Sequence, residues 1–499
     1  LLYGHFSEKN LTNLNYISAP ILNYGKQHYS LFVFAVITIC WLPFLIVYFP
    51  GSVPHDGAVQ INMFFDMDAM TNSHPWLVSI FMGFFVKLGS HISDNFGIFL
   101  ITLIMYLIEA LCYTVVCTKI YSWKLPAAIN FLSISFFAIV PVFGGYATAV
   151  IKDGLFTSFF SLYMVLFIDL IISKQKLNDI KHILFLLFIG CLVCFTRNNG
   201  IYMVIPTCFS IFFLCFRQNK KVAPALLIST LVIYYFVESI LAPSLGVKAG
   251  SKGEMLSIPF QQTARYLKEY PNDVSDEEKR IISNVLYYDN LAENYDPEIS
   301  DPVKKTFHAH STEDIRNYIK VWFRMFLRHP NVYFEATLNN TYGYLYPFHN
   351  CDSLGAYQFY QKMDLLHISL PNGSYVFSEN IRSAMHCYAE LWRDIPVLAE
   401  LVNPGAYTWL LILLVGYSIY HRRFRDIFVF IPPLINVLVC IASPVNGLIR
   451  YALPLMACTP VLIAFTCYRN LANSSNHLNK LTKKKYNYYG RQYAKKKGN

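Results

Sequence analysis

The sequence predicts an all-α membrane protein with about ten transmembrane helices, an interfacial helix in the first outer loop and a mainly helical extracytoplasmic domain. Three observations support this fold class. Of the 499 residues, 55% are hydrophobic and 14% charged, whereas a soluble protein carries roughly 25% charged residues. The apolar residues form runs of about 18 or more, long enough to cross roughly 30 Å of hydrocarbon as helices. Basic residues gather on one side of these runs, which orients the chain in the bilayer.

Ten apolar runs are candidate membrane spans. An eleventh run, residues 74–89, has 16 residues and would be about 24 Å long as a helix, which is marginal for a crossing. It opens with His74-Pro75 and contains Lys87, and if it spanned the membrane the basic loops that follow would face outward, so we expect it to lie flat in the membrane interface. The ten spans are expected at residues 31–49, 95–118, 126–143, 154–173, 182–196, 200–216, 222–242, 406–420, 426–442 and 450–467.

The distribution of lysine and arginine sets the expected orientation. With residues 74–89 on the outer surface and the amino terminus inside, the short cytoplasmic loops hold eleven basic and two acidic residues. The tail 468–499 adds nine Lys/Arg and no acid. We therefore expect a multipass cell-membrane protein with both termini in the cytoplasm. The net charge of +10 then reflects topology and a tail lying on anionic membrane lipid, and it does not indicate nucleic-acid binding.

The expected spans divide the chain into four regions. Residues 1–242 form an N-terminal transmembrane module whose first outer loop covers 50–94. Residues 243–405 form an outer loop of 163 residues, which is too long and too polar for a linker and is expected to be an extracytoplasmic domain. Residues 406–467 form the C-terminal transmembrane helices, and 468–499 form the basic cytoplasmic tail.

The long outer loop contains two signals for helix starts. Ser275–Glu278 is a complete capping box, and Ser311–Asp314 has the same form with Asp in place of Glu. The loop has two cysteines, Cys351 and Cys387, and the sequence leaves open whether they form a disulfide on this oxidising face. The helix after the second box has an apolar face that either packs in the domain core or rests on the membrane. That face carries Ile315, Ile319, Trp322, Phe323 and Phe326.

Charged and polar residues gather at the expected outer ends of the spans. Acids follow the first span and precede the fourth, and cations lie at the outer ends of other spans. Two acids with several cations on one membrane face suit a substrate that has a phosphate to hold and a hydroxyl to activate. The candidate residues are His55, Asp56, His74, Lys152, Asp153, Arg197 and Arg450.

The order of these residues resembles the GT-C superfamily of polyprenyl-phosphate-dependent glycosyltransferases. Those enzymes have an Asp early in the first outer loop and a His-Pro-Pro or Lys-Pro-Pro element that opens a juxtamembrane helix. They also have an Asp before a later span and often an Arg-Tyr near the last span. The resemblance covers roughly residues 30–175 and the last span, and the matching positions are Asp56, His74-Pro75 leading to Leu88-Gly89, Asp153 and Arg450-Tyr451.

The chain departs from this pattern at two positions. Gly57 stands where a second acid usually follows the first, and Trp76 stands in place of a second proline. Both departures weaken a metal assignment and leave Asp56 as the one candidate base. The chain resembles more closely an uncharacterised family of Gram-positive multipass membrane proteins. The stretches that carry this second resemblance are residues 196–200, 261–265 and 339–343.

The resemblance implies a membrane glycosyltransferase. It would move a sugar from a polyprenyl-phosphate donor to an extracytoplasmic acceptor, a cell-surface glycan or a lipid, with inversion at the anomeric carbon. A divalent metal cation is left open, with Asp56 as its candidate ligand. The implied roles are general base for Asp56, phosphate binding for Arg450, Arg197 and Lys152, and orientation of the acceptor or a cation for Asp153, His74 and His55.

Each candidate residue also has a purely structural explanation. Asp56 suits a turn, Asp153 would cap the span that it precedes, and arginines at span ends often anchor a helix in the interface. The competing functions are a multipass transporter or lipid-linked sugar flippase, a non-catalytic anchor for the outer domain, and a polysaccharide polymerase or ligase. Transporters place their sites near the midplane between repeated halves. This chain has no visible repeat and its charges lie at one face, which favours the transferase.

Overall fold

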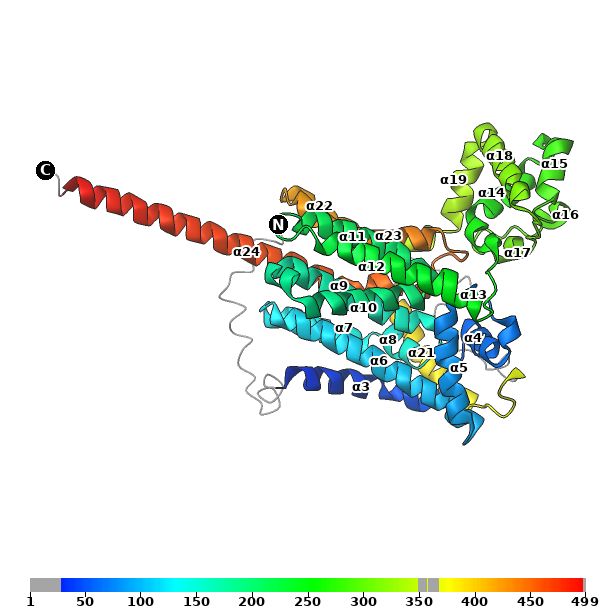
Figure 1. The fold of residues 1–499 in the computed structure, drawn as a ribbon, viewed down its shortest axis with the longest axis horizontal. Helices are drawn as coiled ribbons and strands as arrows, with labels where there is room; N and C mark the ends of the chain where they lie inside the picture. Colours follow the sequence, from blue (N-terminus) through cyan, green and yellow to red (C-terminus); the bar gives the residue numbers. More distant parts are fainter. Residues whose placement is uncertain (1–27, 349–356, 358–367, 497–499) are drawn as a thin grey trace.

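A bundle of long apolar helices makes up most of the molecule (Figure 1). The computed structural model describes residues 28–348, 357 and 368–496, with side chains described to Ala472. The bundle contains α3 (Tyr29–Val47), α6 (Asp94–Ser122), α7 (Ala127–Ile139), α9 (Lys152–Ile172), α10 (Ile180–Thr196), α11 (Ile201–Cys215), α12 (Val222–Tyr235), α22 (Pro404–Tyr420), α23 (Ile427–Ile441) and α24 (Ile449–Lys496).

The all-α, multipass membrane class is confirmed. Within the described residues, seven helices are long and apolar enough to cross a membrane, or eight if α7 and α8 (Pro141–Ala147) count as one bent span. Nine of the ten expected spans each coincide with one helical segment, and the expected span at 126–143 coincides with the bent pair α7 and α8. However, α10 and α22 have 17 residues each and belong with the shorter apolar helices, so the number ten stays a prediction.

The expected span at residues 126–143 is wrong as a single straight helix. Helix α7 ends at Ile139, α8 begins at Pro141, and the two axes differ by 50°. Between them Val140 has a ψ of 120°. A proline ring disfavours helical backbone at the residue before it, so the chain leaves the helix at Val140 and starts a new one at Pro141.

The first outer loop forms two helices, α4 (His55–Phe65) and α5 (Trp76–Ser90). Helix α5 coincides with the expected interfacial helix, and in Figure 1 it runs across the direction of the spans. It packs closely on α6, since a Cβ added at Gly89 would lie 2.7 Å from the Cα of Gly97. This contact fixes the C-terminal end of α5 against the first turn of α6.

The first part of the long outer loop folds as a separate helical domain, the outer domain. Its core contains Phe260, Ile282, Tyr318 and Met325, all with 0% exposure. Both expected capping boxes form, including the one closed by an aspartate. The domain consists of α14 (Ser257–Glu269), α15 (Asp276–Ser283), α16 (Tyr288–Leu291), α17 (Asp301–Lys304), α18 (Thr312–Arg328) and α19 (Pro330–Asn339).

The second part of the loop packs mainly on the spans, and Tyr342 at its start donates a hydrogen bond to Glu298 of the outer domain (2.6 Å). It contains α20 (Tyr342–Leu345) and α21 (Glu379–Asp394), and Tyr344, Ala389 and Trp392 belong to the core of the bundle. The two parts of the loop thus contact different helices, and the single extracytoplasmic domain at residues 243–405 stays a prediction. Cys351 lies outside the described residues, so the question of a disulfide between Cys351 and Cys387 stays open, and Cys387 lies exposed on α21.

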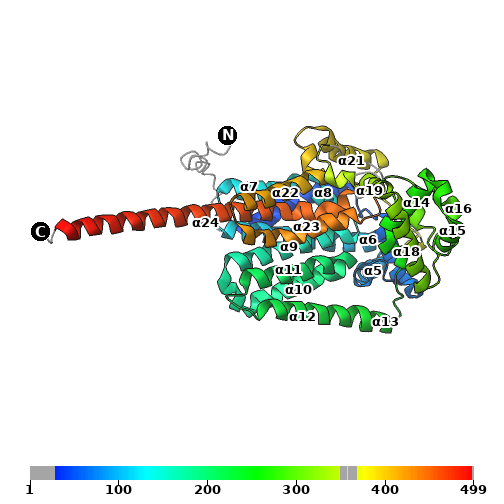
Figure 2. The same cartoon turned by 90° about the horizontal axis from the view of Figure 1, so that it is seen from above.

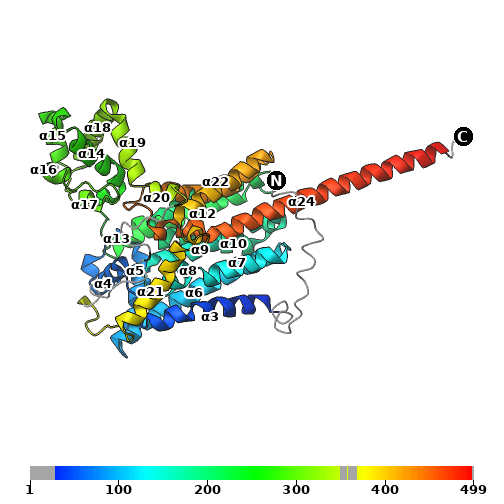
Figure 3. The same ribbon diagram turned by 180° about the vertical axis from the view of Figure 1, so that it is seen from behind.

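The outer domain and the C-terminal extension lie at opposite ends of the molecule (Figures 1, 2 and 3). Helix α24 starts at Ile449 and continues through the expected tail to Lys496. The basic tail is therefore a continuation of the last span. This arrangement separates the acidic outer domain from the basic tail along the direction of the spans.

Candidate functional site

The first and second outer loops are joined by a short backbone pairing that positions Asp56. The amide of Ser52 donates to the carbonyl of Thr148 (3.1 Å), and the amide of Val150 donates to the carbonyl of Ser52 (2.8 Å). Pro54 then ends the extended segment, and α4 begins with Asp56 in its first turn. The carboxylate is thereby held beside Lys152, in the first turn of α9.

Gly57 fits closely between these two loops. A Cβ at this position would lie 1.9 Å from the carbonyl oxygen of Val150, far inside van der Waals contact. The second acid that the resemblance leads one to expect here therefore has no room. The glycine that replaces the second acid of the GT-C pattern thus has a steric cause, and Asp56 is the acid of this turn.

The carboxylate of Asp56 is held by two cations that come from distant parts of the chain. Its Oδ2 lies 2.9 Å from Nη1 of Arg450 and 3.1 Å from Nζ of Lys152. Its Oδ1 lies 3.6 Å from Nδ1 of His55. The side chain of Asp56 is 21% exposed and those of Lys152 and Arg450 only 10% and 11%, so the group faces solvent mainly through Asp56.

A second ion pair, between Asp153 and Arg197, lies next to the contact between Asp56 and Arg450. Asp153 is 1% exposed, its Oδ1 lies 3.1 Å from Nη1 of Arg197, and its Oδ2 lies 3.9 Å from Nη1 of Arg450. The guanidinium of Arg450 thus stands between both carboxylates. Arg197 caps the end of α10, so the site is built from α4, α9, α10 and α24.

His74 completes the group from the chain before α5. Its Nδ1 lies 3.1 Å from Nζ of Lys152, and burial together with the Lys152 ammonium lowers the pKa of His74 to about 4. The ring is therefore neutral near pH 7 and accepts a hydrogen bond from the lysine. We call Asp56, His74, Lys152, Asp153, Arg197 and Arg450 the charge cluster.

The charges in the cluster keep Asp56 ionised. Burial by itself would raise the pKa of Asp56, but the nearby Lys152 and Arg450 hold it well below its usual range. The hydrogen bond to Asp56 in turn raises the pKa of His55 above its ordinary value. The side chain of His55 is 70% exposed, so it stands at the rim of the cluster.

The structure brings together every residue that the sequence predicted for the site. Asp56, Asp153 and Arg450 share one location, as the hypothesis required, although that location does not show what they do. The structure also places Tyr451 beside the charge cluster. The hydroxyl of Tyr451 accepts a hydrogen bond from Nη2 of Arg450 (3.3 Å), and its ring lies 4.8 Å from the Arg197 guanidinium. The Arg-Tyr pair in the sequence is the signal that identifies Tyr451.

A further set of residues, which the sequence did not point to, holds the loop that precedes Arg450 in the chain. The hydroxyl of Tyr344 donates to the carbonyl of Val445 (2.7 Å) and accepts from the amide of Leu448 (3.0 Å). The side-chain amide of Asn340 donates to the carbonyl of Ser443 (3.0 Å). Asn340 lies in the segment 339–343, which carried the second resemblance. We call these three bonds the clasp.

Two acids within the spans do not join the cluster. Glu109 is 1% exposed and packs against α9, where a Cβ at Gly154 would lie 2.3 Å from its Oε1. Glu238 accepts a hydrogen bond from the side chain of Asn72 (2.9 Å), two residues before His74. It therefore supports the loop that positions His74 and does not reach Asp56.

A cavity of about 630 Å³ lies beside the rim of the cluster. Its walls come from one side of α4 and from the segment at Ile368 and Ser369, and its polar groups include His55, Asn62 and Asp66. The hydroxyl of Ser369 donates to Oδ1 of Asn62 (2.6 Å), which closes one wall. Of the candidate site residues, His55 is the one that lines this cavity.

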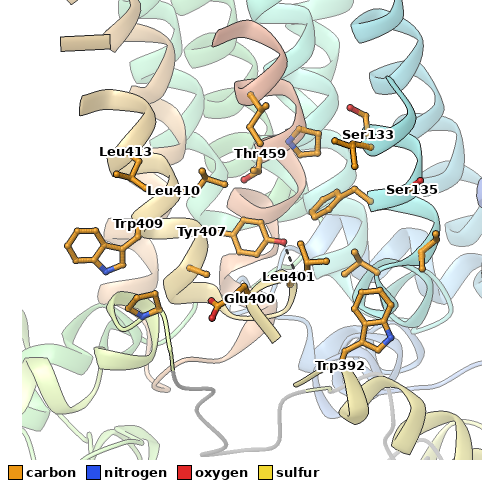
Figure 4. A pocket seen from close by; sticks show the side chains of 18 of the residues that line it. Ser133, Ser135, Trp392, Glu400, Leu401, Tyr407, Trp409, Leu410, Leu413 and Thr459 are labelled. Atoms are coloured by element: carbon orange, nitrogen blue, oxygen red, sulfur yellow. Dashed lines mark hydrogen bonds between the residues drawn. The ribbon is translucent and has the colours of Figure 1, made fainter. Parts of the chain in front are cut away.

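A larger apolar groove of about 1060 Å³ lies between α7, α22 and α24 (Figure 4). Its lining includes Tyr407, whose hydroxyl donates to the carbonyl of Leu401 (2.8 Å), and Thr459. Thr459 follows Arg450 by nine residues, about two and a half helical turns, so the two lie on opposite sides of α24. The groove therefore does not open onto the charge cluster.

The cluster is a poor fit for a divalent metal ion. No group of three His, Cys, Asp or Glu suitable for a metal occurs in the portion of the chain that the structure describes. Asp56 and Asp153 are each already paired with cationic side chains within about 3 Å. These lysine and arginine side chains would repel a metal cation. The metal stays a prediction, and no step below depends on it.

Comparison with known proteins gives one match. The model of a family described as "Family of unknown function (DUF6020)" matches residues 66–480, which is most of the chain. No curated protein and no solved structure matches the sequence. The resemblance to GT-C enzymes is therefore neither supported nor contradicted by these comparisons.

Proposed function

The chain belongs to the family of unknown function DUF6020, and we propose that it is a membrane glycosyltransferase that uses a polyprenyl-phosphate sugar donor. The observation that carries the proposal is the contact between Asp56 and Arg450, 2.9 Å apart and 394 residues apart in sequence. It joins a carboxylate that can accept a proton to a guanidinium that can hold a phosphate.

The charge balance of the cluster suits a phosphodiester. Lys152, Arg197 and Arg450 are cations, Asp56 and Asp153 are anions, and His74 is neutral, which leaves one positive charge in excess. A sugar linked to a polyprenyl chain through one phosphate carries one negative charge. Because buried charges are costly unless they are paired, such a donor would complete the pairing.

The donor would also activate the base. When no phosphate is bound, Lys152 and Arg450 lower the pKa of Asp56 and make it a weak base. A phosphate that draws these cations to itself would raise the basicity of Asp56. The carboxylate would thus become competent only when the donor is in place.

The proposed reaction is a single displacement at the anomeric carbon. The acceptor hydroxyl forms a new bond to that carbon while its proton passes to Asp56. The bond between the anomeric carbon and the phosphate oxygen breaks, and its electron pair leaves with the phosphate. Arg450, Lys152 and Arg197 stabilise the leaving anion, which needs no protonation, and configuration inverts.

The acceptor would approach through the 630 Å³ cavity beside His55. Two features of that cavity support this direction. It is lined by His55, whose ring lies 3.6 Å from the Asp56 carboxylate, and the outer domain stands at the same end of the molecule (Figure 1). We therefore propose an extracytoplasmic acceptor, a cell-surface glycan or a lipid.

The proposal includes a membrane topology. It places ten spans in the cell membrane, α5 flat in the outer interface, the charge cluster at the outer surface and both termini in the cytoplasm. The opposite positions of the outer domain and the α24 extension support it (Figure 2). So does the positive charge of the loops that join the other ends of the spans.

Replacing Asp56 tests the proposal. We expect Asp56→Asn to lower sugar transfer by about 10²- to 10⁴-fold, the usual contribution of a general base, with normal membrane insertion. The measurement is transfer of radiolabel from a set of labelled polyprenyl-phosphate sugars to envelope material in membranes that contain the full chain.

The matched control is Asp68→Asn, which changes an exposed acid in the same outer loop. It should retain full transfer. Full activity in Asp56→Asn, or an equal loss in both variants, would remove the main support for the proposal.

A further inference from the structure

The outer domain exposes four large apolar side chains on its last two helices. Phe323 and Leu327 on α18 are 50% and 64% exposed, and Phe334 and Leu338 on α19 are 62% and 53% exposed. We call these four residues the docking patch. Contiguous exposed apolar groups of this size are uncommon on soluble surfaces and commonly mark an interaction site.

The docking patch lies on the side of α18 that faces away from the domain core. Tyr318, Val321 and Met325 fill the core and are fully buried. Phe323 and Leu327 are one turn apart and project from the opposite side of the helix. The apolar face expected from the sequence thus divides, since Ile319, Trp322 and Phe326 pack on the core while Phe323 does not.

Helix α19 continues the patch. Tyr333 and Ala336 are buried, whereas Phe334 and Leu338, one turn apart, face away from the core. The ring of Phe326 joins the two helices, with centroids 6.0 Å from Phe323 and 6.1 Å from Phe334. The four side chains therefore form one surface and not separate exposed residues.

Helix α19, which carries half of the patch, stands next to the ends of the spans (Figures 1 and 3). In these two views α19 is on the side of the outer domain that faces the bundle, and α18 lies beside it. Seven residues after Leu338, the carbonyl of Leu345 accepts a hydrogen bond from the indole of Trp409 (2.7 Å), in the second turn of α22. A half-exposed tryptophan at the outer end of a span is typical of the lipid interface.

The same face of α18 is basic. Lys320 and Arg324 are exposed on the side that carries Phe323 and Leu327, and Arg316 lies one turn before Lys320 and pairs with Glu313. On α19 the nearest acid, Glu335, is paired with Arg265. A helix with large apolar groups beside lysine and arginine suits a surface of anionic lipid headgroups.

We propose that the outer domain rests on the outer leaflet of the membrane and inserts the docking patch among the lipid headgroups. The partner is the lipid surface itself, recognised through apolar insertion and through the basic side chains of α18. This inference is independent of the proposed enzymatic activity. It gives the outer domain a second attachment to the membrane, beside its covalent links to α12 and α20 (Figure 3).

Site-specific fluorescence tests this contact. The full chain, with its native cysteines replaced, carries a single cysteine at Leu327 labelled with a polarity-sensitive dye and is reconstituted in phosphatidylcholine–phosphatidylglycerol vesicles. The matched control carries the dye at Asp289, whose side chain is 85% exposed on α16. Quenching is measured with a nitroxide lipid and, separately, with aqueous iodide.

We expect the dye at Leu327 to be quenched several-fold more by the nitroxide lipid than the dye at Asp289, and to be protected from iodide. Adding Phe323→Glu and Phe334→Glu should reverse both effects. If the dye at Leu327 is as open to iodide as the dye at Asp289, the proposal is wrong. Protection from both quenchers would indicate a second copy or another protein on the patch, and would equally overturn it.

Discussion

At the scale of single residues, the cluster depends on long-range pairing of charges that would be costly apart. Arg450 stands between Asp56 and Asp153, and its planar guanidinium can face two carboxylates at once. Lys152 holds the other side of Asp56 and also the ring of His74. The pKa values of the histidine and aspartate side chains predict how sugar transfer depends on pH, and this prediction holds whichever sugar is transferred.

The pH dependence of transfer should follow His55. His74 has a pKa of about 4 and Asp56 a pKa well below its usual range, so neither changes charge between pH 6 and 8. The pKa of His55 is raised, so its protonation begins above the ordinary value of about 6.5 as the pH falls. Protonated His55 pairs with Asp56 and weakens the base, so transfer should fall on the acid side.

A pH profile of the transfer rate checks this. His55→Gln should flatten the acid limb, and His91→Gln, an exposed histidine at the end of α5, should leave it unchanged. An acid limb that persists in His55→Gln would show that another group controls it.

Gly57 should tolerate no side chain. A Cβ there would lie 1.9 Å from the Val150 carbonyl, so Gly57→Ala must push the two outer loops apart. Overpacking of this kind costs about 1–3 kcal/mol. The midpoint of thermal unfolding of the detergent-solubilised protein should fall.

Gly416→Ala on α22 is the control for Gly57→Ala, because no heavy atom lies within 4 Å of the added Cβ. Since alanine favours a helix over glycine, its midpoint should be equal or higher. Equal effects of the two substitutions would contradict the steric explanation.

At the scale of elements, the clasp connects the outer loop to the start of α24. Tyr344 on α20 bonds both Val445 and Leu448, and Arg450 follows two residues later. The second part of the long loop is therefore more than a connection between the outer domain and α22. It sets where the helix that carries Arg450, the arginine proposed to bind the phosphate, begins.

Tyr344→Phe should disturb Arg450 without touching it. The substitution leaves the carbonyl of Val445 and the amide of Leu448 without this buried partner, at a cost of about 1–3 kcal/mol each. We expect KM for the donor to rise more than kcat falls, because Arg450 is proposed to bind the donor phosphate. Steady-state kinetics with varied donor measure the two constants.

Tyr346→Phe serves as the comparison, since Tyr346 is 51% exposed on the same short segment. It should leave both constants unchanged. If Tyr344→Phe lowers only the amount of folded protein and leaves KM as it was, the clasp has no role in positioning Arg450.

At the scale of the whole molecule, the outer domain and the tail lie on opposite sides of the membrane in the proposed topology. Single cysteines at Asp289 in the outer domain and at Lys220 between α11 and α12 test this in a background without native cysteines. In intact cells an impermeant maleimide should label Asp289→Cys at once and Lys220→Cys only after the membrane is permeabilised. Labelling of both positions in intact cells would exclude ten spans in this order.

Several features followed from the sequence because they depend on neighbouring residues. An apolar run long enough to cross the bilayer becomes a helix wherever it stands, since its backbone bonds are satisfied locally. Nine of the ten expected spans accordingly coincide with one helical segment each, and both capping boxes form from four consecutive residues. The seven site residues were likewise visible as charges at the outer ends of the spans.

Other features were decided only by the tertiary structure. The pairing of Asp56 with Arg450, the fit of Gly57 against Val150 and the clasp at Tyr344 join segments far apart in the chain. Periodicity describes which face of a helix is apolar but not which other helix will cover it. The division of the α18 face between the domain core and the docking patch shows this limit. The sequence determined which residues leave water, and the packing of helices against one another determined which of them meet.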